Sequence, residues 1–191
     1  MERKHPVPAA APDFHIITGG PGSGKSTLID ALAAKGFHHM PEAGRAIIRD
    51  QVAIGGTALP WADRIAFAEL MLGWELRSWH EAGDLAGPVI FDRGVPDVSG
   101  YLRLCGLPVP SHVERAAEMF RYQRRVFIAP PWREIFGQDT ERKQDFAEAQ
   151  ATYEAMVTVY ADLGYELVSL PLAPVAERVR FVRARMWRVD D

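Results

Sequence analysis

The chain has 191 residues, enough for one domain with a full hydrophobic core, and 48% of them are hydrophobic while 25% are charged. Its net charge of -3 and its pI of about 6.1 argue against an overall nucleic-acid-binding surface. The single cysteine, Cys105, excludes an internal disulfide framework. No apolar stretch approaches the roughly 20 residues that span a bilayer. We expect a cytoplasmic protein, monomeric or homodimeric, that binds neither nucleic acid nor membranes.

Short apolar runs alternate with longer helical stretches along the chain, a pattern typical of βαβ units and a parallel sheet. Residues 1–12 are rich in Ala and Pro and are predicted to form a loose tail, and residues 13–191 to form one domain. Five strands are predicted, at 15–18, 37–40, 88–91, 126–129 and 165–170. Helices are predicted at 25–34, 42–54, 60–82, 97–104, 111–122, 145–163 and 175–189.

This order of elements predicts an α/β fold of the doubly wound type. Its five-stranded parallel sheet would carry helices on both faces, joined by right-handed crossovers. In such sheets ligands bind beyond the carboxyl ends of the strands. The motifs described next each follow a predicted strand end, so local pattern and global position agree.

A glycine-rich segment follows the first predicted strand. Residues 19–26 match the phosphate-binding pattern G-x-x-x-x-G-K-[ST] at every fixed position. Glycines let backbone N–H groups point at one phosphate, and the N-terminus of the next helix adds positive partial charge. Lys25 is predicted to reach the β- and γ-phosphates, and Ser26 to hold Mg2+. The predicted nucleotide-binding residues are Gly20, Gly22, Ser23, Gly24, Lys25, Ser26 and Thr27.

An acid and an arginine, Asp92 and Arg93, close the third predicted strand. An acid after an apolar run can hold magnesium through water, and the adjoining guanidinium can clamp oxygen atoms. Asp92 is therefore a predicted metal ligand, and both residues are predicted to be catalytic. The alternative is a structural ion pair at a strand end. Asp97, five positions after Asp92, is predicted either to cap a helix or to face an acceptor molecule.

Glu42 follows the second predicted strand, and Arg45 lies about one helical turn further on. Glu42 is predicted to take the proton from an attacking hydroxyl, and Arg45 to hold a polar group of the acceptor. The alternative for Glu42 is helix capping, because an acid in a first turn is favoured by the helix dipole.

A polar segment at 131–143 follows the fourth predicted strand, where a lid would close on the nucleotide. Arginines brought in by a lid can stabilise a transferred phosphoryl group and exclude water. Arg133 and Arg142 are the candidates, Arg133 for the nucleotide and Arg142 for catalysis. A solvated, charged helix start is the alternative.

The segments 18–27, 41–45, 91–97 and 139–142 together resemble a group of small bacterial predicted ATPases. That group resembles the ribosylnicotinamide kinase domain of NAD-biosynthesis regulators and, more distantly, the deoxynucleoside kinases. The resemblance, which runs from about 15 to 182, implies a P-loop kinase-like fold with strand order 2-3-1-4-5 and ATP as the nucleotide. It implies that Glu42 and Asp92 flank the acceptor hydroxyl and that Arg93 binds phosphate or acceptor. It also implies that Arg142 belongs to the lid.

Two functions fit these residues. The first, which we favour, is a kinase that moves the γ-phosphate of ATP to a hydroxyl of a small, nucleoside-like acceptor. The second is a nucleotide-dependent regulatory ATPase, in which ATP orders residues 132–143 and a partner protein reads that state. The side chains that choose the acceptor are expected within residues 61–82.

Overall fold

The computed structural model describes residues 12–136 and 145–186. Its strands are β1 Phe14–Gly19, β2 His38–Met40, β3 Val89–Asp92, β4 Arg125–Ala129 and β5 Glu166–Ser169. Its helices are α1 Lys25–Ala33, α2 Ala43–Ile54, α3 Arg64–Ala82, α4 Val95–Leu104, α5 Ser111–Met119, α6 Arg133–Phe136, α7 Phe146–Asp162 and α8 Val175–Met186. Most of the predicted tail and the predicted lid residue Arg142 lie outside the described residues. Among the described residues, no helix is long and apolar enough to cross a membrane.

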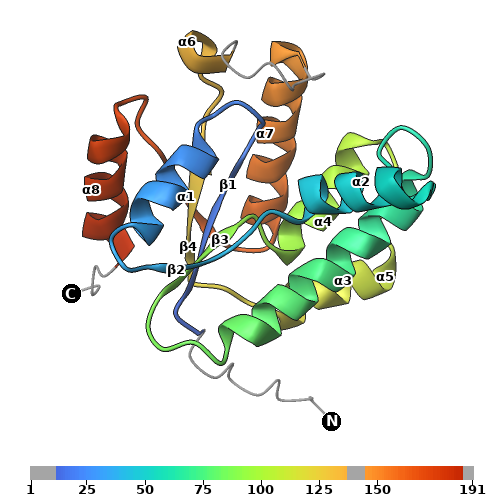
Figure 1. Ribbon diagram of the computed structural model, residues 1–191, viewed down its shortest axis with the longest axis horizontal. Coiled ribbons are helices and arrows are strands. Elements are labelled where there is room, and N and C mark those ends of the chain that lie inside the picture. Colours follow the sequence, from blue (N-terminus) through green and yellow to red (C-terminus); the bar gives the residue numbers. More distant parts are fainter. Residues whose placement is uncertain (1–11, 137–144, 187–191) are drawn as a thin grey trace.

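The five strands form one parallel sheet in the order β2-β3-β1-β4-β5, which confirms the predicted order (Figure 1). The chain leaves β1 toward one edge of the sheet and, after β3, crosses to the other edge. The carboxyl end of β1 therefore lies where the direction of the connections changes, which is where open α/β sheets bind ligands. Gly19 and Asp92 end the two central neighbouring strands at this edge.

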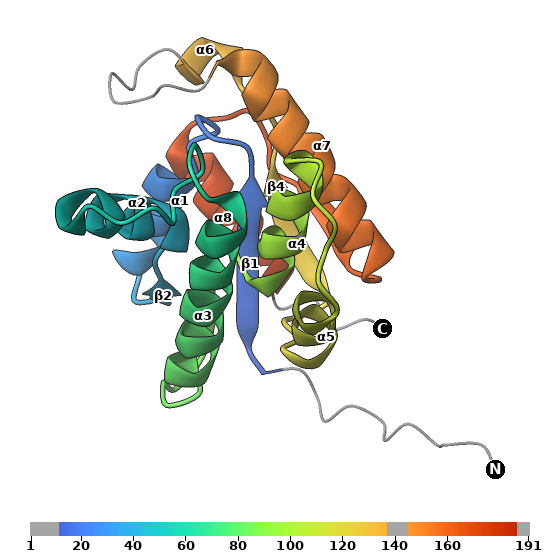
Figure 2. The same ribbon diagram turned by 90° about the vertical axis from the view of Figure 1, so that its right-hand side faces the viewer.

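Helices cover both faces of the sheet (Figures 1 and 2). Helices α1 and α8 pack on one face, and α3, α4, α5 and α7 pack on the other. Neighbouring residues of a strand point to opposite faces, so Ile16 joins one hydrophobic cluster and Ile17 the other. Because both faces are buried, β3 and β4 carry continuous apolar runs rather than alternating ones.

The clearest difference from the sequence prediction concerns α3, which begins at Arg64 and not near residue 60. Asp63 sets this start, since its carboxylate accepts a hydrogen bond of 2.9 Å from the backbone N–H of Ala66. A shorter helix, α6, lies within the segment predicted only as polar. Helix α4 begins at Val95, two residues before Asp97. Such differences arise because local capping contacts, and not hydrophobic periodicity, decide where a helix begins.

Candidate functional site

The loop between β1 and α1 turns at positions that require glycine. Gly19 has a φ of 128°, and a Cβ there would clash with the carbonyl oxygen of Ala129 on the neighbouring strand. Gly24, immediately before α1, is left-handed with a φ of 72°. Glycine adopts such conformations at little cost, which lets the loop wrap around a small space at the start of α1.

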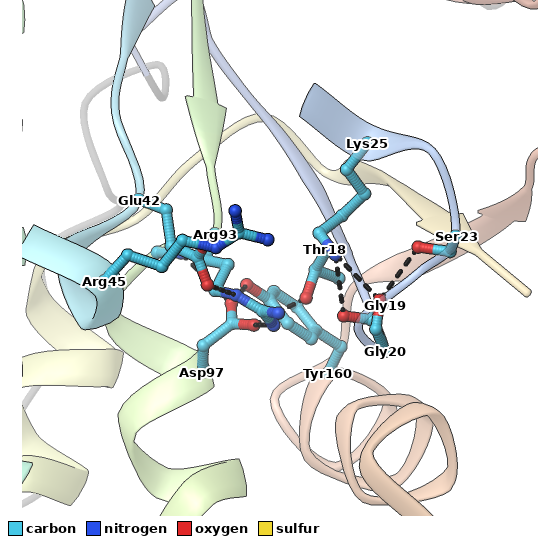
Figure 3. Close-up of polar contacts among 11 residues, drawn as sticks. Thr18, Gly19, Gly20, Ser23, Lys25, Glu42, Arg45, Arg93, Asp97 and Tyr160 are labelled. Carbon is cyan, nitrogen blue, oxygen red and sulfur yellow. Dashed lines mark hydrogen bonds and ion pairs between the residues drawn. The ribbon is translucent and has the colours of Figure 1, made fainter. Parts of the chain in front are cut away.

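Lys25 is buried at the first position of α1, and its side chain folds back over the loop. Its Nζ donates hydrogen bonds to the carbonyl oxygens of Gly19, at 3.2 Å, and Gly20, at 2.8 Å (Figure 3). Burial lowers the pKa of Lys25 to about 8, and the charge on Arg93 adds to this effect, against the opposing pull of nearby carboxylates. An anion in the loop would stabilise the charged ammonium, so the arrangement suits a phosphate.

Most predicted nucleotide-binding residues of the loop line one cavity. These are Gly22, Ser23, Gly24, Lys25, Ser26 and Thr27. Gly20 does not line the cavity, but its carbonyl oxygen accepts from Lys25 and, at 2.8 Å, from the Ser23 hydroxyl. The hydroxyls of Ser26 and Thr27 are on exposed residues and remain accessible to a ligand.

Arg93 has a left-handed backbone with a φ of 74°, and no other non-glycine residue in the described ranges has a positive φ. This conformation costs about 1–2 kcal/mol for a residue with a Cβ. The Nε of Arg93 donates a hydrogen bond to Glu42 at 3.0 Å, and its Nη1 donates one to Asp97 at 3.2 Å (Figure 3). Burial opposes its charge, but the surrounding carboxylates outweigh burial and raise the pKa of Arg93. The guanidinium is therefore fixed and permanently charged at the cavity wall.

Glu42 occupies the N-cap position of α2, but its side chain makes no capping hydrogen bond. Its carboxylate instead pairs with Arg93 and, at 3.5 Å, with the more exposed Arg45. Burial pushes the pKa of Glu42 up, whereas the charges on Arg93 and Lys25 and the hydrogen bond from Arg93 outweigh burial and lower it. Glu42 is thus an ionised carboxylate that faces the cavity together with Arg45.

Asp97 is the centre of a buried network. It is the third residue of α4, and its Oδ2 accepts from the backbone N–H of Gly94, at 3.0 Å, and from the Tyr160 hydroxyl, at 2.6 Å. Its Oδ1 accepts from Thr18, at 2.5 Å, and from Arg93. Asp97 lines the cavity, but these four donors also tie the start of α4 and the Arg93 guanidinium to β1 and α7. This arrangement favours a role at the helix start over direct contact with an acceptor, although the N-cap residue of α4 is Gly94 and not Asp97.

Asp92 is buried at the carboxyl end of β3, and its Oδ1 has no hydrogen-bond partner among the described residues. Burial raises the pKa of Asp92; Lys25 and Arg93 oppose this rise, while Glu42 and Asp97 add to it. No group of three or more His, Cys, Asp or Glu side chains in the described ranges could hold a metal ion. Mg2+, however, is often bound through one or two carboxylates and several waters. A free Asp92 oxygen and the accessible Ser26 hydroxyl fit such a bound ion.

The phosphate loop, Glu42, Arg45, Arg93 and Asp97 line one cavity of about 1450 Å³, whereas Asp92 is not among its lining residues. Small-molecule sites commonly measure about 300–1,000 Å³, so this cavity has room for two ligands. Trp132 and Arg178 line it beside the loop, and α2, α3 and α4 line the part beyond Glu42 and Arg93. Arg133 is not part of the wall, since its guanidinium lies 4.2 Å from the centre of the Phe146 ring.

Two cavity residues, Arg178 and Glu75, were not singled out from the sequence. Arg178 is 3% exposed and donates from α8 to the carbonyl oxygens of Ser23, at 3.0 Å, and Gly24, at 3.2 Å. No local pattern marks it, because the contact joins residues more than 150 positions apart. The sequence could have indicated Glu75, because it places an acid among the core-facing positions of α3.

A model of the family described as an AAA domain matches residues 14–178. The chain belongs to this family. The match spans all five strands and every loop that lines the cavity, including the phosphate loop of this AAA domain. The family membership agrees with the resemblance to small predicted ATPases. The comparison with curated proteins finds no match.

Two solved structures have a similar fold. Deoxyadenosine kinase from M. mycoides, with products dCMP and a flexible dCDP bound, has a TM-score of 0.69 and 13% identity, covering 92% of this AAA-domain chain and 100% of that chain. NadR protein in complex with NR has a TM-score of 0.65 and 16% identity, covering 93% of this chain and 52% of that one. At such identities the likeness concerns the fold. It confirms a P-loop, nucleoside-kinase-like architecture.

Proposed function

We propose that the protein binds Mg-ATP and transfers the γ-phosphate to a hydroxyl of a small, nucleoside-like acceptor. The observation that carries this proposal is one cavity lined both by the phosphate loop and by Glu42, Arg93 and Arg45. A plain ATPase needs space only for nucleotide and water, whereas about 1450 Å³ leaves room for a second small molecule. The fold shared with a deoxyadenosine kinase and with NadR supports the same reaction class.

In this proposal Lys25 and the loop N–H groups hold the β- and γ-phosphates. The acceptor oxygen bonds to the γ-phosphorus while the bond to the β–γ bridging oxygen breaks, and ADP leaves. Glu42 accepts the proton of the hydroxyl, and Arg93 offsets negative charge on the moving phosphoryl group. Bound Mg2+, held by Ser26 and through water by Asp92, would supply further charge neutralisation.

The lowered pKa of Glu42 has a consequence for the order of events. A weakly basic carboxylate cannot remove the proton of a free hydroxyl before attack. In a loose transition state the hydroxyl becomes acidic only as its oxygen bonds to phosphorus, so a weak base is sufficient at that stage. Glu42 would thus first orient the hydroxyl and then accept the proton late.

The experiment that tests the proposal measures ADP release with Mg-ATP across nucleosides, ribosylnicotinamide, sugars and vitamins. The Lys25→Ala protein serves as the blank. A compound that stimulates release and gains the mass of one phosphate establishes the kinase and its acceptor class. A flat panel above a slow, Lys25-dependent background contradicts the kinase and favours a regulatory ATPase that acts on a partner protein.

The affinity for ATP is expected to fall as pH rises. The pKa of Lys25 in the free protein is about 8, and the phosphates bind the charged ammonium. Below this pH the charged form is present before ATP arrives, and above it the protein must first take up a proton. From about pH 7 to about pH 9 the dissociation constant should therefore increase about tenfold.

Isothermal titration calorimetry in buffers of different ionisation enthalpy measures both the affinity and the proton uptake. Lys25→Arg is the matched control, because an arginine keeps its charge over this range and should give a nearly flat profile. If the ATP affinity of the wild type changed as little with pH as that of Lys25→Arg, the pH dependence could not be assigned to Lys25.

A further inference from the structure

Glu75 is a buried acid on the core-facing side of α3. It is 4% exposed and shares its face with the buried residues Ala68, Leu72 and Ala82. Carboxylic acids seldom occupy such positions without a partner, because removing the charged form from water is costly. Glu75 also lines the cavity, which gives its carboxyl access to a ligand.

No residue in the described ranges gives the Glu75 carboxyl a hydrogen bond or an ion pair. Arg93, whose positive charge acts on Glu75, directs its donors to Glu42 and Asp97 instead. Burial raises the pKa of Glu75 well above its ordinary value, and the surrounding carboxylates, Asp97 first among them, add to the rise against the pull of Arg93. This rise favours the neutral form of the carboxyl, and a neutral carboxyl offers one donor beside one acceptor.

The walls next to Glu75 are suited to a flat apolar ring. Phe67 and Tyr101 meet edge to face with ring centres 5.4 Å apart, and Met71, Val98 and Met156 also line the cavity. The Tyr101 hydroxyl is a second buried polar group there, and its polar neighbour is the Cys105 thiol. Apolar walls with a few polar groups are typical of a ligand site.

We propose that Glu75 recognises the acceptor through an edge that carries a hydrogen-bond donor next to an acceptor, as in a carboxamide or an amino-substituted heterocyclic ring. The proposal rests on the proposed function and assigns its substrate class. The ring lies against Phe67 and Met71, and its polar edge pairs with the two oxygens of Glu75. Binding thus supplies the hydrogen bonds that the folded protein does not make.

Three matched pairs of nucleosides test this edge directly. They are adenosine and purine riboside, cytidine and pyrimidin-2-one riboside, and ribosylnicotinamide and ribosylpyridinium. Within each pair only the amino or carboxamide group is missing from the second member. Dissociation constants are measured by calorimetry with a non-hydrolysable ATP analogue present, so that the nucleotide part of the cavity is already filled.

The variants are Glu75→Gln, which keeps a donor beside an acceptor, and Glu75→Leu, which removes both. Wild type and Glu75→Gln should bind the complete member of at least one pair about tenfold or more tightly than the incomplete member. Glu75→Leu should lose this preference while binding the ATP analogue normally. Leucine in place of a buried acid is tolerated in most cores, and the unfolding temperature of each variant checks this.

Several outcomes would overturn the proposal. One is a wild type without preference in any pair, and another is Glu75→Leu binding the complete member as wild type does. A third is that Glu75→Gln loses ribosylnicotinamide binding as completely as Glu75→Leu does. Glu75 would then act as an anion that attracts a cationic ring.

Phosphate transfer is assayed separately. Preference in binding without any transfer would end the kinase proposal and leave this one standing.

Discussion

Replacing Lys25 by alanine is expected to weaken ATP binding about ten- to a hundredfold. The ammonium lies 2.8 Å and 3.2 Å from two loop carbonyl oxygens, which it can exchange for phosphate oxygens. Each hydrogen bond to a charged group contributes about 1.5–3 kcal/mol, and the alanine variant loses at least one such bond to the γ-phosphate. Calorimetric titration with Mg-ATP measures the loss directly.

The same variant should fold at least as stably as wild type near pH 7. The pKa of Lys25 in the folded protein, about 8, lies below the ordinary lysine value of 10.5. Its charge therefore opposes folding below about pH 8, and this penalty fades as pH rises from about 8 toward 10.5. Lys35→Ala is the matched control, since Lys35 is exposed just beyond the same helix and does not line the cavity. Equal ATP affinity in both variants would refute the nucleotide site.

Glu42→Gln is expected to lower turnover about a hundredfold or more while leaving ATP affinity near that of wild type. Glutamine has the size of glutamate but cannot accept the proton of the acceptor hydroxyl. Arg93 keeps its contact with Asp97, so its guanidinium should stay at the cavity wall. Steady-state kinetics with the acceptor found in the panel separates kcat from KM.

Glu81→Gln provides the control for this prediction. Glu81 is also an ion-paired acid, 2.7 Å from Arg77, but both side chains are exposed and outside the cavity wall. Its replacement should leave kcat and KM unchanged. If Glu42→Gln behaves as this control does, Glu42 is a residue of the helix start and not the base. Parallel losses of ATP affinity and turnover would instead assign Glu42 to shaping the phosphate loop.

The sequence by itself determined the position of the phosphate cradle. Its glycines, lysine and serine act through backbone geometry and through a helix start only a few residues away, so a local pattern is sufficient. The continuous apolar run that ends in β3 likewise predicted a buried parallel strand, because both faces of the sheet are covered. Glu42, Arg45, Arg93 and Asp97, which follow strand ends, line one cavity because parallel strands end together, whereas Arg133 lies outside its wall.

Only the tertiary structure decided how those side chains are paired. Asp97 takes hydrogen bonds from Thr18 and Tyr160, which lie 79 and 63 positions away, and so it anchors Arg93. The left-handed backbone of Arg93 has no local sequence signal, because neighbouring elements hold it in that conformation.

Dependence on contacts between distant parts of the chain also explains why Arg178 and Glu75 were not singled out from the sequence. The contact of Arg178 with the phosphate loop joins α8 to the segment before α1, and a linear pattern carries no information about such a contact. For Glu75, helical periodicity could have placed an acid on the buried face of α3, although it was not singled out in the sequence analysis. Whether that acid met a partner or an open cavity depended on the packing of α2, α3 and α4, since burial and hydrogen bonding are properties of the assembled fold.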